Sequence, residues 1–289
     1  MKEQDCLRRF LFEQLGVRGE WVRLETSWQQ AKQYQQLSVG VQEKLGEALA
    51  SAVLLSATIK FEGAMILQAE GTGGLKALVA QATHDRKIRG LARGDKKIAA
   101  GTLAEMMGEG RLVITIDPEK GEPYQGVVSL EGDALAGVIT TYFLQSEQLE
   151  TRVWLFANET HAAGLFLQEL PAQESYEADW ERISALANTV TKDEMLTLDC
   201  EEMLFRLFNE EKVRVYEPEP IEFECSCSVQ KIEVALLALG KDELNSILEE
   251  REKIEADCEF CGKQYSFDKV DVEGLLSTQI VEKTSDTRH

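Results

Sequence analysis

Four cysteines decide how the end of this chain folds, and they lie in the stretches ECSCS (residues 224–228) and CEFCG (residues 258–262). Thirty residues separate the two pairs. Thiolates are the soft ligands that Zn²⁺ prefers, and two close pairs of them complete a tetrahedral shell. The same thiols can also be oxidised to two local disulfides, which releases the metal. The spacing therefore predicts a site with a metal-bound state and an oxidised state.

The surroundings of the pairs favour a closed, structural zinc site with four sulfur ligands. Gly262 follows the last cysteine directly and allows the tight turn that a metal-binding knuckle needs. No histidine lies near either pair in the sequence, so an all-thiolate shell is preferred over a shell with three cysteines and a histidine. The predicted ligands of one Zn²⁺ are Cys225, Cys227, Cys258 and Cys261.

The segment around these cysteines, residues 221–289, has few large apolar side chains and would be marginal as a core alone. Structural zinc supplies about 10–16 kcal/mol of apparent binding free energy in small domains, which exceeds the stability of a marginal domain. A disulfide closed across one residue forms a small, strained ring, and strained disulfides are readily reduced. Oxidation of the thiols is therefore expected to release the metal, unfold this segment and act as a reversible switch.

Composition places the chain among globular proteins of the reducing cytoplasm. Its 289 residues are 44% apolar, which is enough for about two domains. The N-terminal stretch contains charged residues where a signal peptide would be uninterrupted and apolar, and no apolar run is long enough for a membrane span. We therefore expect a cytoplasmic protein without a membrane partner, in which paired cysteines indicate metal or redox chemistry.

The net charge of −20 argues against nucleic acid as a partner. Between Asp193 and Phe260, twenty acidic residues stand against seven Lys and Arg. Phosphate binding requires clustered Lys and Arg, so the charge argues against DNA or RNA as a main ligand. A solubilising role of the acidic residues remains open beside a specific one.

The pattern of elements predicts an α+β protein in three parts: an α/β core domain (1–171), a helical linker (172–220) and a zinc-binding redox-switch domain (221–289). In the core, a helix is expected over 39–59, with hairpins over 64–82 and 111–130. Further expected elements are a helix over 133–148 and strands over 151–157 and 163–170.

The linker is predicted to contain a helix over 176–188 and another that starts at the capping box of Thr191 and Glu194 and runs to Phe208. These helices could dock on the core domain or detach from it. Cys6 is placed on an N-terminal helix and Cys200 on the linker helix, both as small packing residues. In the last part, Ser228 is expected to cap a helix.

Other candidate sites are outweighed by ordinary structural roles. The stretch Gly71 to Gly74 lacks the spacing of a phosphate-binding loop and predicts a hairpin turn. His84-Asp85 has no accompanying nucleophile motif and is placed in a surface loop. An exposed acidic helix face is a commoner explanation than a cation site for Asp199, Glu201 and Glu202.

At its cysteine motifs the chain resembles the redox-regulated heat-shock holdase family, the 33-kDa heat-shock proteins of bacteria. The matching residues are Phe223 to Ser228 and Cys258 to Gly262, continued by Tyr265 and Phe267. The resemblance covers most of the chain, although Glu150 and Leu165 depart from the family pattern. Its other matching segments are Tyr124 to Val128, Gly132-Asp133, Tyr142-Phe143, Ser146 to Gln148, Leu167 to Pro171, Asn209 to Glu211 and Val215 to Pro218.

The resemblance implies an ATP-independent chaperone without catalytic residues, which is inactive when reduced and zinc-bound. Oxidative stress would convert Cys225–Cys227 and Cys258–Cys261 to disulfides, release Zn²⁺ and disorder the C-terminal part and the linker. The oxidised form would dimerise and bind unfolding client proteins. Apolar surface of the linker and of the adjoining core is the expected client-binding area.

Two other functions stay open on the residues alone. A thiol–disulfide oxidoreductase could use Cys258 and Cys261, although no thioredoxin-like setting is visible in the sequence. The chain could also be a zinc-ribbon adaptor that binds nucleic acid or protein. The acidic residues around both motifs disfavour the binding of nucleic acid.

Overall fold

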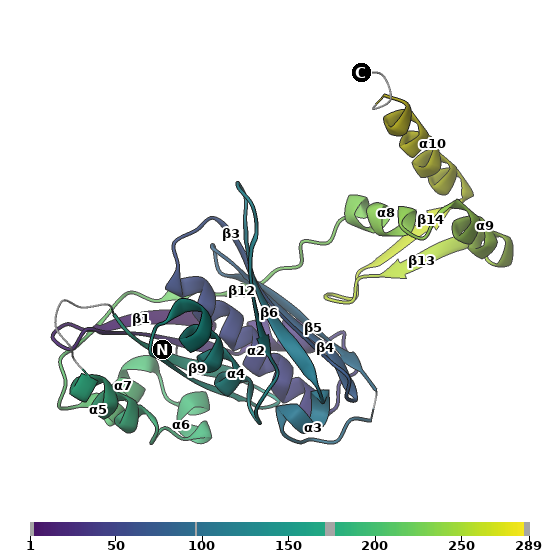
Figure 1. Cartoon of the computed structure of the whole chain (residues 1–289). Coiled ribbons are helices and arrows are strands. Elements are labelled where there is room, and N and C mark those ends of the chain that lie inside the picture. The colour runs from purple at the N-terminus through teal and green to yellow at the C-terminus, as the bar shows by residue number, and fades with distance from the viewer. Residues whose placement is uncertain (1–2, 96, 171–176, 286–289) are drawn as a thin grey trace. The chain divides into compact units, whose positions relative to one another are not determined.

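The computed structural model describes residues 3–95, 97–170 and 177–285, and the predicted boundary at Pro171 and helix start at Tyr176 lie outside these ranges. The chain separates into two compact units, Met1–Glu224 and Cys225–His289. Both units combine helices with strands (Figure 1), which confirms the predicted α+β class. Residues 221–224 belong to the first unit. The three-part division into core, linker and switch stays a prediction.

The first unit contains a six-stranded sheet, here called sheet A, in which every pair is antiparallel. Its strands are β1 (Cys6–Phe12), β2 (Val17–Leu24), β8 (Thr151–Ala157), β9 (Ala162–Glu169), β10 (Val213–Val215) and β11 (Glu219–Pro220). Their order is β10-β1-β2-β9-β8, and β11 also pairs with β1. The prediction of a helix around Cys6 is wrong, because pairing with β2 and with the distant β10 makes this segment a strand.

The remaining strands described in the first unit form a second six-stranded sheet, here called sheet B. It is built of β3 (Gly63–Gly71), β4 (Leu75–Thr83), β5 (Lys87–Gly94), β6 (Gly110–Pro118), β7 (Tyr124–Ser129) and β12 (Glu222–Phe223). The order is β12-β5-β4-β3-β6-β7, with β12 parallel to β5. The two predicted hairpins, β3–β4 and β6–β7, are confirmed.

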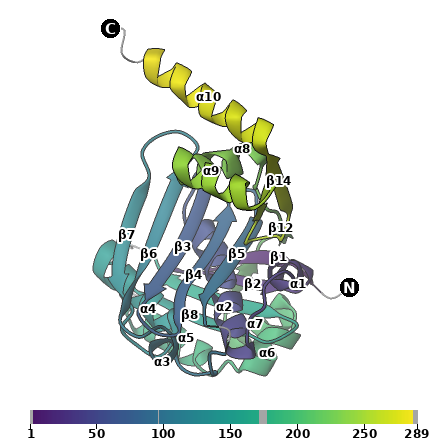
Figure 2. The ribbon, with the colours of Figure 1, turned by 90° about the vertical axis from the view of Figure 1, so that its right-hand side faces the viewer.

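Helix α2 (Val39–Thr58) lies between the two sheets and forms the centre of the main core (Figures 1 and 2). It is buried on most sides, as expected for a helix that is apolar nearly all round. On the side of sheet B, a Cβ atom added at Gly90 would lie 3.0 Å from the Leu49 side chain. On the side of sheet A, a Cβ atom at Gly46 would lie 2.6 Å from Cβ of Ala157. Glycine therefore permits close packing on both sides of the helix.

Shorter helices surround this centre, and their bounds correct one prediction. The helix expected over 133–148 begins at Leu135 and changes after Tyr142 into a short π-helix, η1. The helices of the first unit besides α2 are α1 (Thr26–Lys32), α3 (Leu103–Met107), α4 (Leu135–Tyr142), η1 (Phe143–Glu147), α5 (Glu177–Ala187), α6 (Lys192–Thr197) and α7 (Cys200–Phe208).

Helices α5, α6 and α7 pack on the face of sheet A that points away from α2. There they form a second apolar cluster with side chains such as Phe10, Phe12 and Trp21. The predicted capping box is present, with the Thr191 hydroxyl accepting a hydrogen bond from the Glu194 amide at 3.3 Å. The predicted continuous helix to Phe208 is wrong, because Asp199 forms a second capping box and starts α7.

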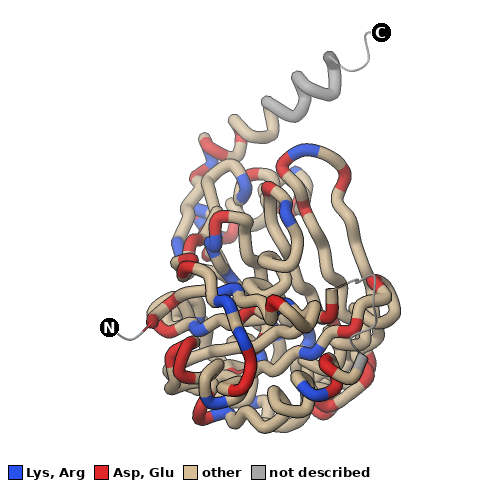
Figure 3. The backbone as a smooth tube through the Cα atoms, turned by 90° about the vertical axis from the view of Figure 1, so that its left-hand side faces the viewer, with Lys and Arg blue, Asp and Glu red and all other residues tan. Residues whose placement is uncertain are grey.

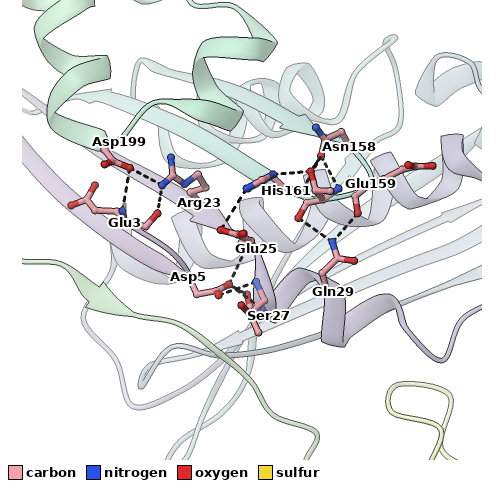
Figure 4. A network of polar contacts seen from close by, with 12 residues as sticks. Glu3, Asp5, Arg23, Glu25, Ser27, Gln29, Asn158, Glu159, His161 and Asp199 are labelled. Atoms are coloured by element: carbon pink, nitrogen blue, oxygen red, sulfur yellow. Dashed lines mark hydrogen bonds and ion pairs between the residues drawn. The ribbon is translucent and has the colours of Figure 1, made fainter. Parts of the chain in front are cut away.

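A buried arginine fastens the break between α6 and α7 to sheet A (Figure 4). Arg23 on β2 is 2% exposed in its side chain and donates hydrogen bonds to the Leu198 carbonyl and to Oδ1 of Asp199, each at 2.7 Å. The backbone amide of Glu3 donates to the same Asp199 oxygen at 3.1 Å. A buried charge requires such partners, so the helices dock on the sheet through ion pairs as well as through apolar contacts.

The second unit is small. It contains α8 (Val229–Leu237), α9 (Lys241–Glu250), the antiparallel hairpin β13 (Lys253–Asp257) and β14 (Gln264–Asp268), and α10 (Lys269–Ser285). Its core has seven buried members among the described residues: Leu236, Leu244, Ile254, Cys258, Tyr265, Phe267 and Val272. Within the described ranges of the whole chain, no helix combines the length and apolar character needed to cross a membrane.

Candidate metal centre

The first cysteine pair is held by the start of α8. The hydroxyl of Ser228 accepts a hydrogen bond from the Lys231 amide at 3.3 Å and caps the helix, as the sequence predicts. The Lys231 ammonium donates back to the carbonyl of Ser226 at 2.8 Å, and Ser226 lies between the two cysteines. The helix start therefore fixes the backbone between Cys225 and Cys227.

The second pair lies in the turn between β13 and β14. The Cys258 amide donates to the Lys263 carbonyl at 2.9 Å, and the Gly262 amide donates to the Cys258 carbonyl at 2.7 Å. Gly262 has φ of +68°, a left-handed conformation that favours glycine. The turn thus has the knuckle form expected of a C-x-x-C-G metal ligand segment.

The four sulfur atoms meet in one cluster and all lie within 4.8 Å of one another. Sγ of Cys225 lies 3.6 Å from Sγ of Cys258, and Sγ of Cys227 lies 3.5 Å from Sγ of Cys261. A tetrahedral ion with metal–sulfur bonds of about 2.3 Å places its sulfurs about 3.8 Å apart. All four thiols are free rather than bridged. Their number, type and spacing fit one metal ion with four thiolate ligands.

Tyr265 on β14 supports the cluster from the side. Its hydroxyl donates a hydrogen bond to Sγ of Cys227 at 3.1 Å. Burial alone would raise the pKa of the Cys227 thiol, but the hydrogen bonds from Tyr265 and the other cysteines outweigh it and lower that pKa to about 7. The same contact raises the pKa of Tyr265 to about 12. The Cys227 sulfur therefore carries negative charge more readily than the sulfur of an ordinary cysteine.

The neighbouring thiols of Cys261 and Cys225 keep their own protons more strongly than an ordinary cysteine does. Burial first, and then the hydrogen bonds to the other three sulfurs, raise the pKa of Cys261 to about 12. Burial likewise raises the pKa of Cys225. Four thiolates crowded together repel one another, so a cation is required before all four can be ionised at neutral pH.

Replacing Tyr265 by Phe is expected to weaken binding of Zn²⁺ to the reduced protein about tenfold. The ring keeps its place in the small core, but the hydrogen bond that stabilises the Cys227 thiolate is lost, and such supporting contacts typically contribute a factor of ten or more to metal affinity. Competition with a chromogenic chelator measures the affinity. The matched control is Tyr34→Phe, which changes an exposed ring in the first unit. Equal affinities of Tyr265→Phe and the unchanged protein would contradict the assigned role.

The remaining candidates from the sequence have structural roles. Asp199 and Glu202 form the capping box of α7, and Glu201 pairs with Arg8 at 3.0 Å, so these carboxylates are committed to polar contacts. Gly71 to Gly74 form the predicted turn between β3 and β4. His84 lies in the turn after β4, where Nδ1 accepts a hydrogen bond from the Gly63 amide at 3.0 Å.

The two isolated cysteines lie outside the sulfur cluster. Cys6 and Cys200 are both buried in the apolar cluster under α5–α7, as expected for packing residues. Burial raises the pKa of Cys6 to about 12 and that of Cys200 well above its usual value. Neither thiol has the low pKa or the exposure that reactive cysteines show.

Sequence reasoning missed Arg23, which holds the helices on the sheet, and the contact by which Tyr265 supports the sulfur cluster. Arg23 gives no sequence signal, because its buried position depends on the docking of α6 and α7. The hydrogen bond from Tyr265 to Cys227 joins residues 38 positions apart. The start of α7 could have been found, since Asp199 and Glu202 have the spacing of a capping box.

Comparisons with known proteins agree over the full chain. A family model described as Hsp33 protein matches residues 5–268. A 33 kDa chaperonin of Nitrosococcus oceani is 54% identical over 289 residues, covering 100% of both chains. A 33 kDa chaperonin of Pseudomonas aeruginosa is 44% identical over 297 residues, again covering 100% of both.

A solved structure supports the fold. The crystal structure of the 33 kDa chaperonin from Thermotoga maritima superposes with a TM-score of 0.81, and the match covers 96% of this chain and 99% of that one at 24% identity. The architecture is therefore shared at low sequence identity. With a family model that spans both units and relatives well above 30% identity over their whole length, the chain belongs to the Hsp33 family.

Proposed function

We propose that this protein is a cytoplasmic, ATP-independent chaperone that binds unfolding proteins and is switched on by oxidation of its four clustered cysteines. The chaperone role is supported by the family and by relatives named 33 kDa chaperonin. The redox switch is supported by one observation: the sulfur atoms of Cys225, Cys227, Cys258 and Cys261 lie within 4.8 Å of one another in a unit whose own core is small.

In the reduced protein, Zn²⁺ would hold the four sulfurs as thiolates and crosslink the start of α8 to the β13–β14 turn. Peroxide takes two electrons from each cysteine pair, and each pair becomes a disulfide while the peroxide is reduced to water. We place these disulfides at Cys225–Cys227 and Cys258–Cys261. A disulfide sulfur is a poor metal ligand, so oxidation removes the shell and with it most of the free energy that keeps the second unit folded.

The activated protein would bind clients through apolar surface and associate as a homodimer. The apolar cluster between sheet A and helices α5–α7 supplies such surface if these helices are released. A role without nucleic acid is supported by the net charge of −20 and by the acidic positions that are interspersed with basic ones along the backbone (Figure 3). The cysteines act in this proposal as sensors and ligands rather than as catalysts.

Light scattering of a heat-aggregating client tests the proposal. The reduced, zinc-loaded protein is expected to give little protection. Protein treated with peroxide at an unfolding temperature should suppress aggregation at near-equimolar ratio and release one Zn²⁺ per chain. Insulin reduction is measured in parallel and should show no turnover. Equal protection before and after oxidation would contradict the switch, and catalytic insulin reduction would favour a thiol–disulfide oxidoreductase.

A further inference from the structure

A cavity of about 380 Å³ lies within the first unit, at the C-terminal end of α2. Its apolar wall comes from α2, sheet B and η1 and includes Leu55, Met65, Ile114 and Phe143. Tyr124, which is half exposed, also lines it. The volume and the mainly apolar wall are those of a site for a small organic molecule.

Several of the segments that carry the family resemblance outside the cysteines contribute to this cavity. Tyr124 of the stretch Tyr124 to Val128 lines it, together with Tyr142, Phe143 and Glu147. The hydroxyl of Tyr142 donates to the Glu147 carboxylate at 3.0 Å, and a Cβ atom at Gly126 would lie 2.3 Å from the Tyr142 ring. Phe143 to Glu147 form the π-helix η1, a rare element that often marks functional sites. None of these residues belongs to the unit that holds the four cysteines.

One cation lines the cavity without an anionic partner. Arg18 on β2 donates from Nε and Nη2 to the side-chain oxygen of Gln168, at 3.1 and 2.6 Å, and from Nη1 to the Thr58 carbonyl at 3.1 Å. All these acceptors are neutral, and among the described residues no carboxylate oxygen lies within 4.0 Å of the guanidinium. A guanidinium has five N–H donors, so Arg18 keeps two of them for a further acceptor.

The nearest acidic neighbour along the strand does not fully compensate this charge. Glu20 is buried two residues further along β2, and one of its oxygens has no hydrogen-bond partner. Burial raises the pKa of Glu20 to about 7, against the opposing influence of Arg18 and Arg9. Burial therefore weakens the negative charge of this carboxyl. The carboxylate of Glu147, which also lines the cavity, already accepts the hydrogen bond from the Tyr142 hydroxyl and is not paired with Arg18.

We propose that the cavity binds a small carboxylate with an apolar body, of the size of a medium-chain fatty acid. The carboxylate would accept hydrogen bonds from the two remaining N–H groups of Arg18, and the hydrocarbon chain would lie against Leu55, Met65, Ile114 and Phe143. Charge-assisted hydrogen bonds to a guanidinium supply the specificity for the headgroup, and apolar burial supplies the rest. The inference is independent of the proposed chaperone function and of the redox state of the cysteines.

Isothermal titration calorimetry of the full-length, reduced, zinc-loaded protein tests this inference with three probes of equal chain length. Decanoate should bind at one site per chain. Decanol, which lacks the charge, and decyltrimethylammonium, which reverses it, should each bind at least about tenfold more weakly. Equal binding of the three probes, or no saturable binding of decanoate, would overturn the proposal.

Variants locate the site. Arg18→Gln should weaken decanoate at least about tenfold, whereas Arg111→Gln, an exposed position on β6 outside the cavity, should leave it unchanged. Leu149 lines the cavity from a partly buried position, so Leu149→Trp should block decanoate while Arg18 is kept. If Arg18→Gln fails to fold, the binding of decanoate to Leu149→Trp and the comparison of decanoate, decanol and decyltrimethylammonium still test the proposal. Unchanged decanoate binding in Leu149→Trp would overturn the assignment of the site.

Discussion

Replacing Cys258 by Ser is expected to unfold the second unit of the reduced protein. Cys258 is buried, and it belongs to both the sulfur cluster and the seven-residue core. A serine hydroxyl is a poor ligand for a soft metal site, so most of the roughly 10–16 kcal/mol that structural zinc contributes would be lost. A core of this size cannot replace that free energy. Zinc content should fall from one ion per chain to nearly none, and helical circular dichroism should decrease.

The matched control is Cys6→Ser, which changes a buried cysteine outside the sulfur cluster. This variant should keep one Zn²⁺ per chain and the circular dichroism of the unchanged protein. Amide exchange over 225–285 distinguishes unfolding of the second unit from a general loss of stability. Protected amides in Cys258→Ser, with its zinc lost, would show that the metal does not hold this unit together.

Asp199→Ala is expected to loosen α6 and α7 from sheet A without changing the four clustered cysteines of the second unit. The substitution leaves the guanidinium of Arg23, 2% exposed, without its carboxylate, and removes the cap of α7. Breaking a buried ion pair typically costs about 3–5 kcal/mol, and we expect the lower end because the Asp199 side chain is 26% exposed. A loss of about 3 kcal/mol lowers the exchange protection of amides in α6 and α7 about a hundredfold. Under the proposed function, the reduced variant should also protect clients partially.

Glu210→Ala provides the control, because Glu210 is an exposed acidic residue just beyond α7. Its amide protection and client protection should match those of the unchanged protein. Hydrogen exchange with mass spectrometry over 192–208 reports the docking directly. Unchanged protection in Asp199→Ala would mean that the ion pair with Arg23 does not hold these helices on the sheet.

The candidate site was predictable because its signals are local in the sequence. Each signal acts within a few residues of the chain. The two cysteine pairs meet in one cluster, the glycine after Cys261 adopts a left-handed turn conformation, and Ser228 caps a helix, as predicted. The hairpins of sheet B follow for the same reason, since alternating apolar residues flank a short turn. The assignment of Zn²⁺ as the bound metal is proposed from the preference of this ion for thiolate ligands.

The errors occurred where distant segments decide the local structure. Cys6 to Phe12 have no local signal that prevents a helix, and they become a strand because β2 and β10 provide hydrogen bonds on both edges. The expected helix from Thr191 to Phe208 is broken at Leu198 and Asp199, where the distant Arg23 binds both residues and adds to the local capping box of Asp199. Helix propensity favours continuity there, but a buried guanidinium gains more from a free carbonyl and a carboxylate.

The pairing of β1 with β10 has a consequence for the newborn protein on the ribosome. Phe10 faces Val215 across the sheet, so one edge of the first strand has no partner until about 200 more residues have been made. At about 5–20 residues per second, translation leaves that edge uncovered for roughly 10–40 s. An uncovered strand edge is a template for aggregation. During its own synthesis, this chain thus passes through the kind of state from which it is proposed to rescue others.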